Sequence, residues 1–226
     1  PALARHVADA TSGPNAMQAI AKIGGDDAAS IAALRRVAAS PNAPHRALAL
    51  AALAELGALS SVPDMVAALS DTRVDTRILA AQSLGRLRAV ESVPALTARL
   101  QDAEPQVRTA AADALASIGP SARAATQALA RQLDAADERQ RNAARRALAA
   151  IGGTEAEAAL RTDAQRFAEA DLAQFRAVRA SDARKVADLL RELPLERRRL
   201  LAPTVALDTD FDVALPCAGI AFTHDA

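Results

Sequence analysis

The 226-residue chain has few of the residues that build β-sheets, disulfides and metal sites. Aromatic residues make up only 2% of it, all of them Phe, whereas alanine accounts for 62 residues. Because strands favour β-branched and aromatic side chains and contain little alanine, this composition excludes a large β-sandwich or barrel. The single cysteine, Cys217, excludes an internal disulfide and any cysteine-rich metal site.

Neither sign of charge is in excess, and long apolar runs are missing. The 27 basic residues balance 27 acidic ones, so the formal net charge is zero. A nucleic-acid-binding protein usually carries a basic excess, so we expect no nucleic-acid partner. No uncharged apolar run reaches the length of about 18 residues that a membrane span needs, and no signal-peptide pattern is visible. We therefore expect no membrane insertion and a cytoplasmic location.

The chain does contain a repeat of 31 to 33 residues. Each repeat has one apolar anchor residue: Ile23, Leu56, Leu87, Ile118 and Ile151. The third residue before every anchor is Ile or Leu, and the seventh before it is always Ala. These positions share one face of an α-helix. The pattern predicts five helical hairpins, over residues 1–24, 26–57, 60–88, 91–119 and 121–152.

Helix-breaking residues divide each repeat into two helices. Pro63 and Pro94 lie in equivalent places, where the first turn of a helix tolerates proline. Ser61 and Ser92, two residues earlier, are expected to cap these helices. Gly follows every anchor except Leu87 and suits a helix end that needs a left-handed residue. A hairpin of this size cannot bury its own apolar face, so neighbouring hairpins must stack into a solenoid.

The fourth repeat carries the clearest family pattern. It contains Val93-Pro94-Ala95-Leu96, then Pro105-Gln106-Val107-Arg108, then Ala111-Ala112-Asp113-Ala114-Leu115, and ends with Ile118-Gly119. This segment resembles a HEAT-like repeat, closest to the short bacterial form named after the phycobilisome bilin lyases. The resemblance covers about residues 14–160. It implies an all-α fold, a right-handed α-solenoid of about five HEAT-like hairpins with a helical C-terminal cap.

Two other repeat architectures fit less well. Tetratricopeptide repeats have aromatic positions that this chain lacks, and ankyrin repeats contain a Thr-Pro-Leu-His run that is absent. The repeat register ends after Gly153. We therefore predict a solenoid over 1–153, a helical cap over 154–202, and an extended or partly ordered tail over 203–226.

No constellation of catalytic residues is recognisable. His6, His45 and His224 lie far apart and form no zinc-ligand spacing with one another or with cysteine. Cys217 has no base nearby that would activate it. The run Arg197-Arg198-Arg199 is interpreted as a solvated helix end. We expect no metal, no cofactor and no catalytic residue, and hence no enzymatic activity.

An arginine recurs ten residues before four of the anchors: Arg46, Arg77, Arg108 and Arg141. Asp71 and Asp102 each lie six residues before one of these arginines. In HEAT-like families such a column resembles a structural ladder, because a planar guanidinium can bond a carboxylate or a turn carbonyl of the next hairpin. Ligand binding is the alternative role.

The second helix of each repeat offers a candidate binding groove. The second, fifth, sixth and ninth residues before each anchor point away from the predicted core. Second helices line the concave surface in HEAT-like solenoids, so these positions predict a groove that is apolar at one end and basic at the other. Its predicted residues are Leu50, Ile78, Gln82, Thr109, Asp113, Asn142, Arg145 and Arg146. We expect Arg145 and Arg146 to retain unpaired charge for an acidic partner segment; plain solvent exposure is the alternative interpretation.

The leading hypothesis is a non-enzymatic interaction scaffold or adaptor that binds a partner protein or peptide in this groove. The family resemblance implies an alternative, a subunit of a bilin lyase or a chaperone for tetrapyrrole attachment. A HEAT-like alkylpurine DNA glycosylase is disfavoured by the scarcity of aromatic residues and the zero net charge.

Overall fold

The computed structural model describes residues 2–9, 11–23, 28–41, 43 and 45–179, with side chains up to residue 166. Its α-helices are α1 (Gly13–Ile23), α2 (Ala28–Ala39), α3 (Arg46–Glu55), α4 (Val62–Ala68), α5 (Val74–Arg86), α6 (Val93–Arg99), α7 (Pro105–Ile118), α8 (Thr126–Gln132), α9 (Glu138–Ile151) and α10 (Thr154–Arg179). Residues 1–160 form one compact part, and the described residues 161–179 belong to another. Cys217, His224, the run 197–199, residues 180–202 of the predicted cap and the tail 203–226 lie outside the described residues.

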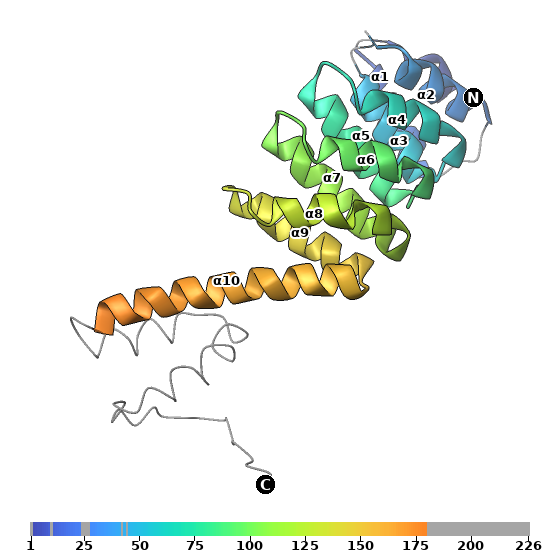
Figure 1. The fold of residues 1–226 in the computed structure, drawn as a ribbon. Coiled ribbons are helices and arrows are strands. Elements are labelled where there is room, and N and C mark those ends of the chain that lie inside the picture. The colour runs from blue at the N-terminus through green and yellow to red at the C-terminus, as the bar shows by residue number, and fades with distance from the viewer. Residues whose placement is uncertain (1, 10, 24–27, 42, 44, 180–226) are drawn as a thin grey trace, which may run out of the picture. The chain divides into compact units, whose positions relative to one another are not determined.

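Within the first compact part the hairpins stack in chain order, from α2–α3 to α8–α9 (Figure 1). We call α2, α4, α6 and α8 the A helices, and α3, α5, α7 and α9 the B helices. The prediction of an all-α solenoid is confirmed. The first repeat departs from the predicted hairpin over 1–24, because only a 3-10 turn, η1 (Leu3–Arg5), precedes α1.

Three further 3-10 turns, η2 (Leu59–Ser61), η3 (Val90–Ser92) and η4 (Gly119–Ala125), lead into the later A helices. Pro63 and Pro94 lie in the first turns of α4 and α6, as predicted. The predicted capping by Ser61 and Ser92 is wrong, because neither hydroxyl accepts a hydrogen bond from a backbone N–H of the helix that follows, and both residues are fully buried. The Ser92 hydroxyl donates to the carbonyl of Ala89 at 2.6 Å instead of accepting from a helix N–H.

A residue in the left-handed backbone conformation lies at or just after the end of each of the four B helices. Gly57, Gly119 and Gly152 have φ values of 67°, 72° and 66°. Arg88 occupies the equivalent place in the third repeat with φ 49°. A side chain in this conformation costs roughly 1–2 kcal/mol, because its Cβ crowds the following carbonyl oxygen.

The core consists of the predicted leucine and alanine columns. The residues three and seven before the later anchors are fully buried: Leu53, Leu84, Leu115, Leu148, Ala49, Ala80, Ala111 and Ala144. The anchors themselves are less uniform. Ile118 and Ile151 are buried, but Ile23 is 71% exposed, so the first anchor is not a core residue.

Successive B helices pack against one another more extensively than successive A helices do. A Cβ atom built on Gly85 of α5 would lie 2.7 Å from the Cα atom of Ala114 in α7. Only glycine allows these two backbones to approach so closely without a shift. Because the B helices lie nearer to one another than the A helices do, the stack curves toward the B helices, whose outer face is concave.

The arginine column joins neighbouring repeats. The Arg77 guanidinium donates through Nη2 and Nε to the two carboxylate oxygens of Asp102, at 2.9 and 3.1 Å. It also donates to the carbonyl of Asp71, at the turn that begins its own helix, at 2.9 Å. Arg46 donates through Nη1 to the Asp71 carboxylate, at 2.5 Å, and through Nε to the carbonyl of Ala38 in its own repeat, at 2.7 Å. Each arginine thus ties a turn or helix of its own repeat to the carboxylate of the next.

The last repeats replace the carboxylate by an amide. Ala135 stands six residues before Arg141, where the earlier repeats have aspartate. Arg108 donates instead to the side-chain carbonyl of the buried Gln140, at 2.9 Å. Gln140 donates in turn to Gln132, which bonds the carbonyl of Leu100 at 3.0 Å. The connection between the fourth and fifth repeats therefore carries no buried carboxylate of this column.

Asp71 and Asp102 are held in their charged form. Burial acts to raise the pKa of Asp71, but the backbone N–H of Arg73 and the Arg46 guanidinium outweigh it and lower the pKa below its ordinary value. The pKa of Asp102 is lowered likewise: burial opposes the shift, while Arg77 and the backbone N–H of Glu104 produce it. The ionised carboxylates consequently contribute to stability at neutral pH.

The burial pattern predicts which substitutions in α5 and α7 are costly. Leu84→Ala and Leu115→Ala should each lower the free energy of unfolding by roughly 2–5 kcal/mol, because they leave cavities among fully buried side chains. Gln82→Ala, on the exposed side of α5, should change it by no more than roughly 0.5 kcal/mol. Urea denaturation measures all three, and equal losses at Leu84 and Gln82 would contradict the assigned faces.

The ladder predicts a loss of stability in acid. A folded-state pKa below the unfolded value of about 3.9 stabilises the fold above that pH, and this contribution disappears as the pH falls through the folded-state pKa. Asp71→Asn should cost about 1.5–3 kcal/mol at pH 7, because it removes a charge-assisted bond to Arg46. Denaturation from pH 7 to pH 2 should show the two proteins converging below pH 4. Parallel curves would show that Asp71 does not contribute through its charge.

Candidate functional site: the concave face of the B helices

The B-helix face, meaning the concave surface of α3, α5, α7 and α9, is built from two exposed columns. Five residues before the anchors lie Ala51, Gln82, Asp113 and Arg146. Nine residues before them lie Ala47, Ile78, Thr109 and Asn142. All eight side chains are exposed or half-buried. Six of them are residues predicted for the groove: Ile78, Gln82, Thr109, Asp113, Asn142 and Arg146.

In α3, α5 and α7 the sixth residue before the anchor does not belong to this face. Leu50 is fully buried, as are its equivalents Ala81 and Ala112, so the assignment of Leu50 to the groove is wrong. Gly85 lies one turn after Ala81 on the same side of α5 and packs against Ala114 of α7, so this side of the helix faces the following B helix. The small residues of the B helices therefore allow close packing between repeats, as Gly85 does against Ala114. They do not form an open floor for a partner.

Ion pairs cross the B-helix face from one helix to the next. Arg146 of α9 bonds Asp113 of α7 at 2.7 Å, and both side chains are about half exposed. Arg86 of α5 lies 3.6 Å from Glu55 of α3. The expectation that Arg146 keeps an unpaired charge is wrong, because its carboxylate partner comes from the preceding repeat and not from its own helix.

Two other arginines of α9, Arg145 and Arg141, also have polar contacts. Arg145 is half-buried and donates to the side-chain carbonyl of Asn142 at 2.8 Å. Arg141 donates to the carbonyls of Ala135 and Ala136, at 2.7 and 2.8 Å. The periodic spacing of Asp113 and Arg146, 33 residues apart in one column, was the sequence signal for their pairing.

The chemistry of the B-helix face suits contact with a polypeptide. Its N-terminal part is apolar, with Ala47, Ala51 and Ile78, and its later part is polar. The amide of Gln82 is exposed at the centre, where it can both donate and accept. Among the described residues, no group of three His, Cys, Asp or Glu side chains is placed to hold a metal ion.

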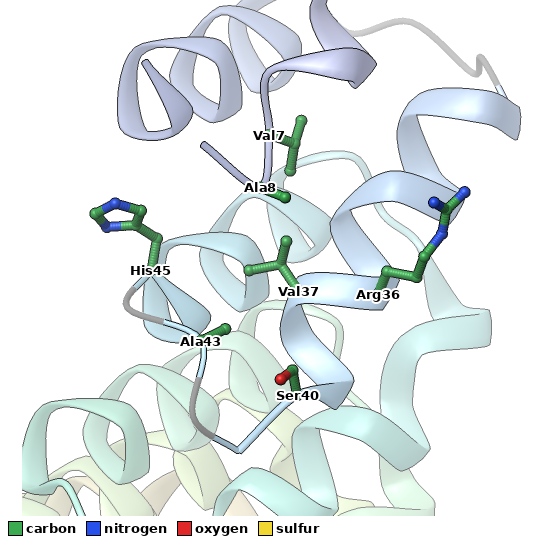
Figure 2. Close-up of a pocket in the computed structure, with 7 residues that line it drawn as sticks. All are labelled: Val7, Ala8, Arg36, Val37, Ser40, Ala43 and His45. Carbon is green, nitrogen blue, oxygen red and sulfur yellow. The ribbon is translucent and has the colours of Figure 1, made fainter. Parts of the chain in front are cut away.

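A separate cavity of about 280 Å³ lies at the N-terminal end of the repeats. Figure 2 shows Val7 and Ala8 after η1, Arg36, Val37 and Ser40 on or just after α2, and Ala43 and His45 before α3. His6 is not among the residues that line it. The lining is mainly apolar, and its polar side chains are those of Arg36, Ser40 and His45. Figure 2 shows Arg36 and His45 on opposite sides of the cavity.

In the ranges that the structure describes, no helix has both the length and the apolar character needed to cross a membrane.

Solved structures with the same fold include natural and designed repeat proteins. The complex of CpcE and CpcF of phycocyanin lyase from Nostoc sp. PCC7120 has a chain that is 21% identical, with a TM-score of 0.59 over 83% of this chain and 73% of that one. A designed armadillo repeat protein in complex with the peptide (KR)4 is 16% identical, with a TM-score of 0.56 over 91% of this chain and 98% of that one. An engineered protein is 20% identical, with a TM-score of 0.55 over 91% and 96%. At these identities the likeness shows the fold alone.

A search of curated proteins finds no match. The family model for HEAT repeats matches residues 31–116 and, in a second register, residues 62–149. The two matches together span more than half of the chain and contain the arginine column and the buried leucines of the B helices. The chain belongs to the HEAT repeat family.

Proposed function

We propose that the chain is a non-enzymatic scaffold that holds a partner protein or peptide against the B-helix face, in the cytoplasm. The observation that carries this proposal is the face itself, a concave surface to which four equivalent helices contribute side chains at the same two positions. Concave solenoid surfaces of this kind are extended binding surfaces. The designed armadillo protein in complex with (KR)4 is a solenoid of similar fold that binds a peptide.

The electrostatics of the face favour a partner segment of low net charge. Arg86 and Arg146 are each paired with a carboxylate of the preceding B helix, so neither sign dominates the surface. An acidic segment would have to displace Asp113 before it could bond Arg146. We therefore place the main contacts at uncharged side chains, with Gln82 at their centre and Ile78 and Thr109 beside it on α5 and α7.

A matched pair of substitutions tests this proposal. The tagged chain is used to isolate its partner, which mass spectrometry identifies and titration then quantifies. Gln82→Arg places a longer, charged side chain at the centre of the B-helix face and should weaken binding by roughly tenfold or more, as changes at the centre of an interface do. Gln127→Arg makes the same change at an exposed site of the A helix α8 and should leave affinity within about twofold. Equal affinities of the two variants would exclude the B-helix face as the binding surface.

The likeness to the phycocyanin lyase complex favours one second candidate, a role in tetrapyrrole attachment. In that case the B-helix face would hold a bilin or the protein that carries it. Mixing the chain with free bilin distinguishes the candidates, because binding changes the visible absorbance of a tetrapyrrole. An unchanged bilin spectrum would exclude direct bilin binding and would agree with the scaffold proposal.

A further inference from the structure

The junctions between neighbouring B helices are held by two kinds of acceptor. In the α3–α5 and α5–α7 junctions the ladder arginine bonds a carboxylate, that of Asp71 or of Asp102. In the α7–α9 junction Arg108 bonds the side-chain carbonyl of Gln140. A carboxylate takes up a proton in acid, whereas an amide stays neutral. The three junctions therefore differ in the one property that responds to pH.

The two carboxylate contacts are buried. The side chains of Asp71 and Asp102 are 2% and 5% exposed, and the ladder arginines that bond them are at most 12% exposed. Each carboxylate also contacts a second arginine, Arg73 at Asp71 and Arg99 at Asp102. A proton on either carboxylate thus removes the negative partner of two arginines. One of these guanidinium groups is then buried without a counter-charge, which is strongly destabilising.

The carboxylates that contact α9 are more exposed. Asp113 pairs with Arg146 of α9, and their side chains are 47% and 58% exposed, so this pair contributes little to stability. Asp137 accepts from two backbone N–H groups at the start of α9 and is exposed as well. The buried contact between Arg108 and Gln140 keeps its hydrogen bond in acid, because the guanidinium stays protonated and the amide stays neutral.

We propose that the solenoid opens selectively in acid: below about pH 4 the α3–α5 and α5–α7 junctions separate, while the α7–α9 junction stays closed. Packing between the helices does not distinguish the junctions, because the three pairs of B helices pack about equally extensively. In a repeat protein each pair of neighbours contributes its own term to stability, so the loss of one contact acts on its own junction. Both titratable junctions flank α5. The inference rests on the ladder contacts and not on the function proposed above.

Hydrogen–deuterium exchange followed by mass spectrometry, on the full chain, locates the opening. Dividing each observed rate by the intrinsic rate at that pH gives protection that can be compared between pH 7 and pH 2.5. Peptides from α5 should lose protection by roughly tenfold or more, and peptides from α9 by less than about threefold. Equal losses in α5 and α9 would overturn the proposal, because they would show that acid acts on the whole solenoid alike.

Two variants move the titratable contact. Asp71→Asn/Asp102→Asn should lower the protection of α5 at pH 7 and reduce its further loss at pH 2.5 to less than about threefold, because no proton remains to be taken up. Gln140→Glu gives Arg108 a carboxylate partner and should extend the acid-induced loss to α9. Gln127→Glu adds the same charge at an exposed site of α8 and should leave the response of α9 as in the wild type.

Circular dichroism at pH 7 checks that each variant is folded, and the asparagine variant alone decides if Gln140→Glu does not fold. A response of α5 to acid that persists in the asparagine variant would overturn the proposal. So would a response of α9 that is the same in folded Gln140→Glu as in Gln127→Glu.

Discussion

The close approach of successive B helices is the constraint on which the rest of this fold depends. At Gly85 and Ala114 two helix backbones lie so near that a single added carbon would collide. Such contacts need small residues on the sides of each B helix, which accounts for much of the alanine in the chain. They also make the B side of the stack shorter than the A side and thereby curve it. The concave face is a consequence of packing between repeats and not of any one repeat.

The same packing decides which side chains a partner can reach. A helix that is flanked on both sides exposes a narrow strip, here the fifth and ninth residues before each anchor. The neighbouring sixth position turns into the interface with the next helix, where Leu50 is fully buried. Charged side chains on this strip can then form ion pairs between neighbouring helices, as Asp113 and Arg146 do. A surface that is basic by counting residues in one helix becomes neutral once two helices lie side by side.

The arginine ladder and Arg88 show two different uses of arginine. Arg46 and Arg77 are buried or nearly so, and their guanidinium groups are satisfied by carboxylates and turn carbonyls of adjacent repeats. Burial of such charges is tolerated only because both partners are present and hydrogen-bonded. Arg88 is exposed and strained, and no described residue bonds its side chain. The first use holds the repeats in register, and the second leaves a charge available at the surface.

The sequence alone determined four of the five predicted helical hairpins, their boundaries to within a few residues, and the leucine and alanine columns of the core. These features follow from local periodicity, because positions such as Leu84 and Ala80 share one helix face whatever the neighbouring repeat contributes. The left-handed ends at Gly57 and Gly119 are equally local. What only the tertiary structure decided concerns contacts between residues about 30 positions apart. The burial of Leu50, the pairing of Arg146 with Asp113 and the replacement of the ladder carboxylate by Gln140 all belong to this class. The residue pattern of one helix specifies which of its side chains point away from the core of its own repeat. The distance to the next helix determines whether those side chains are exposed to water or buried against protein.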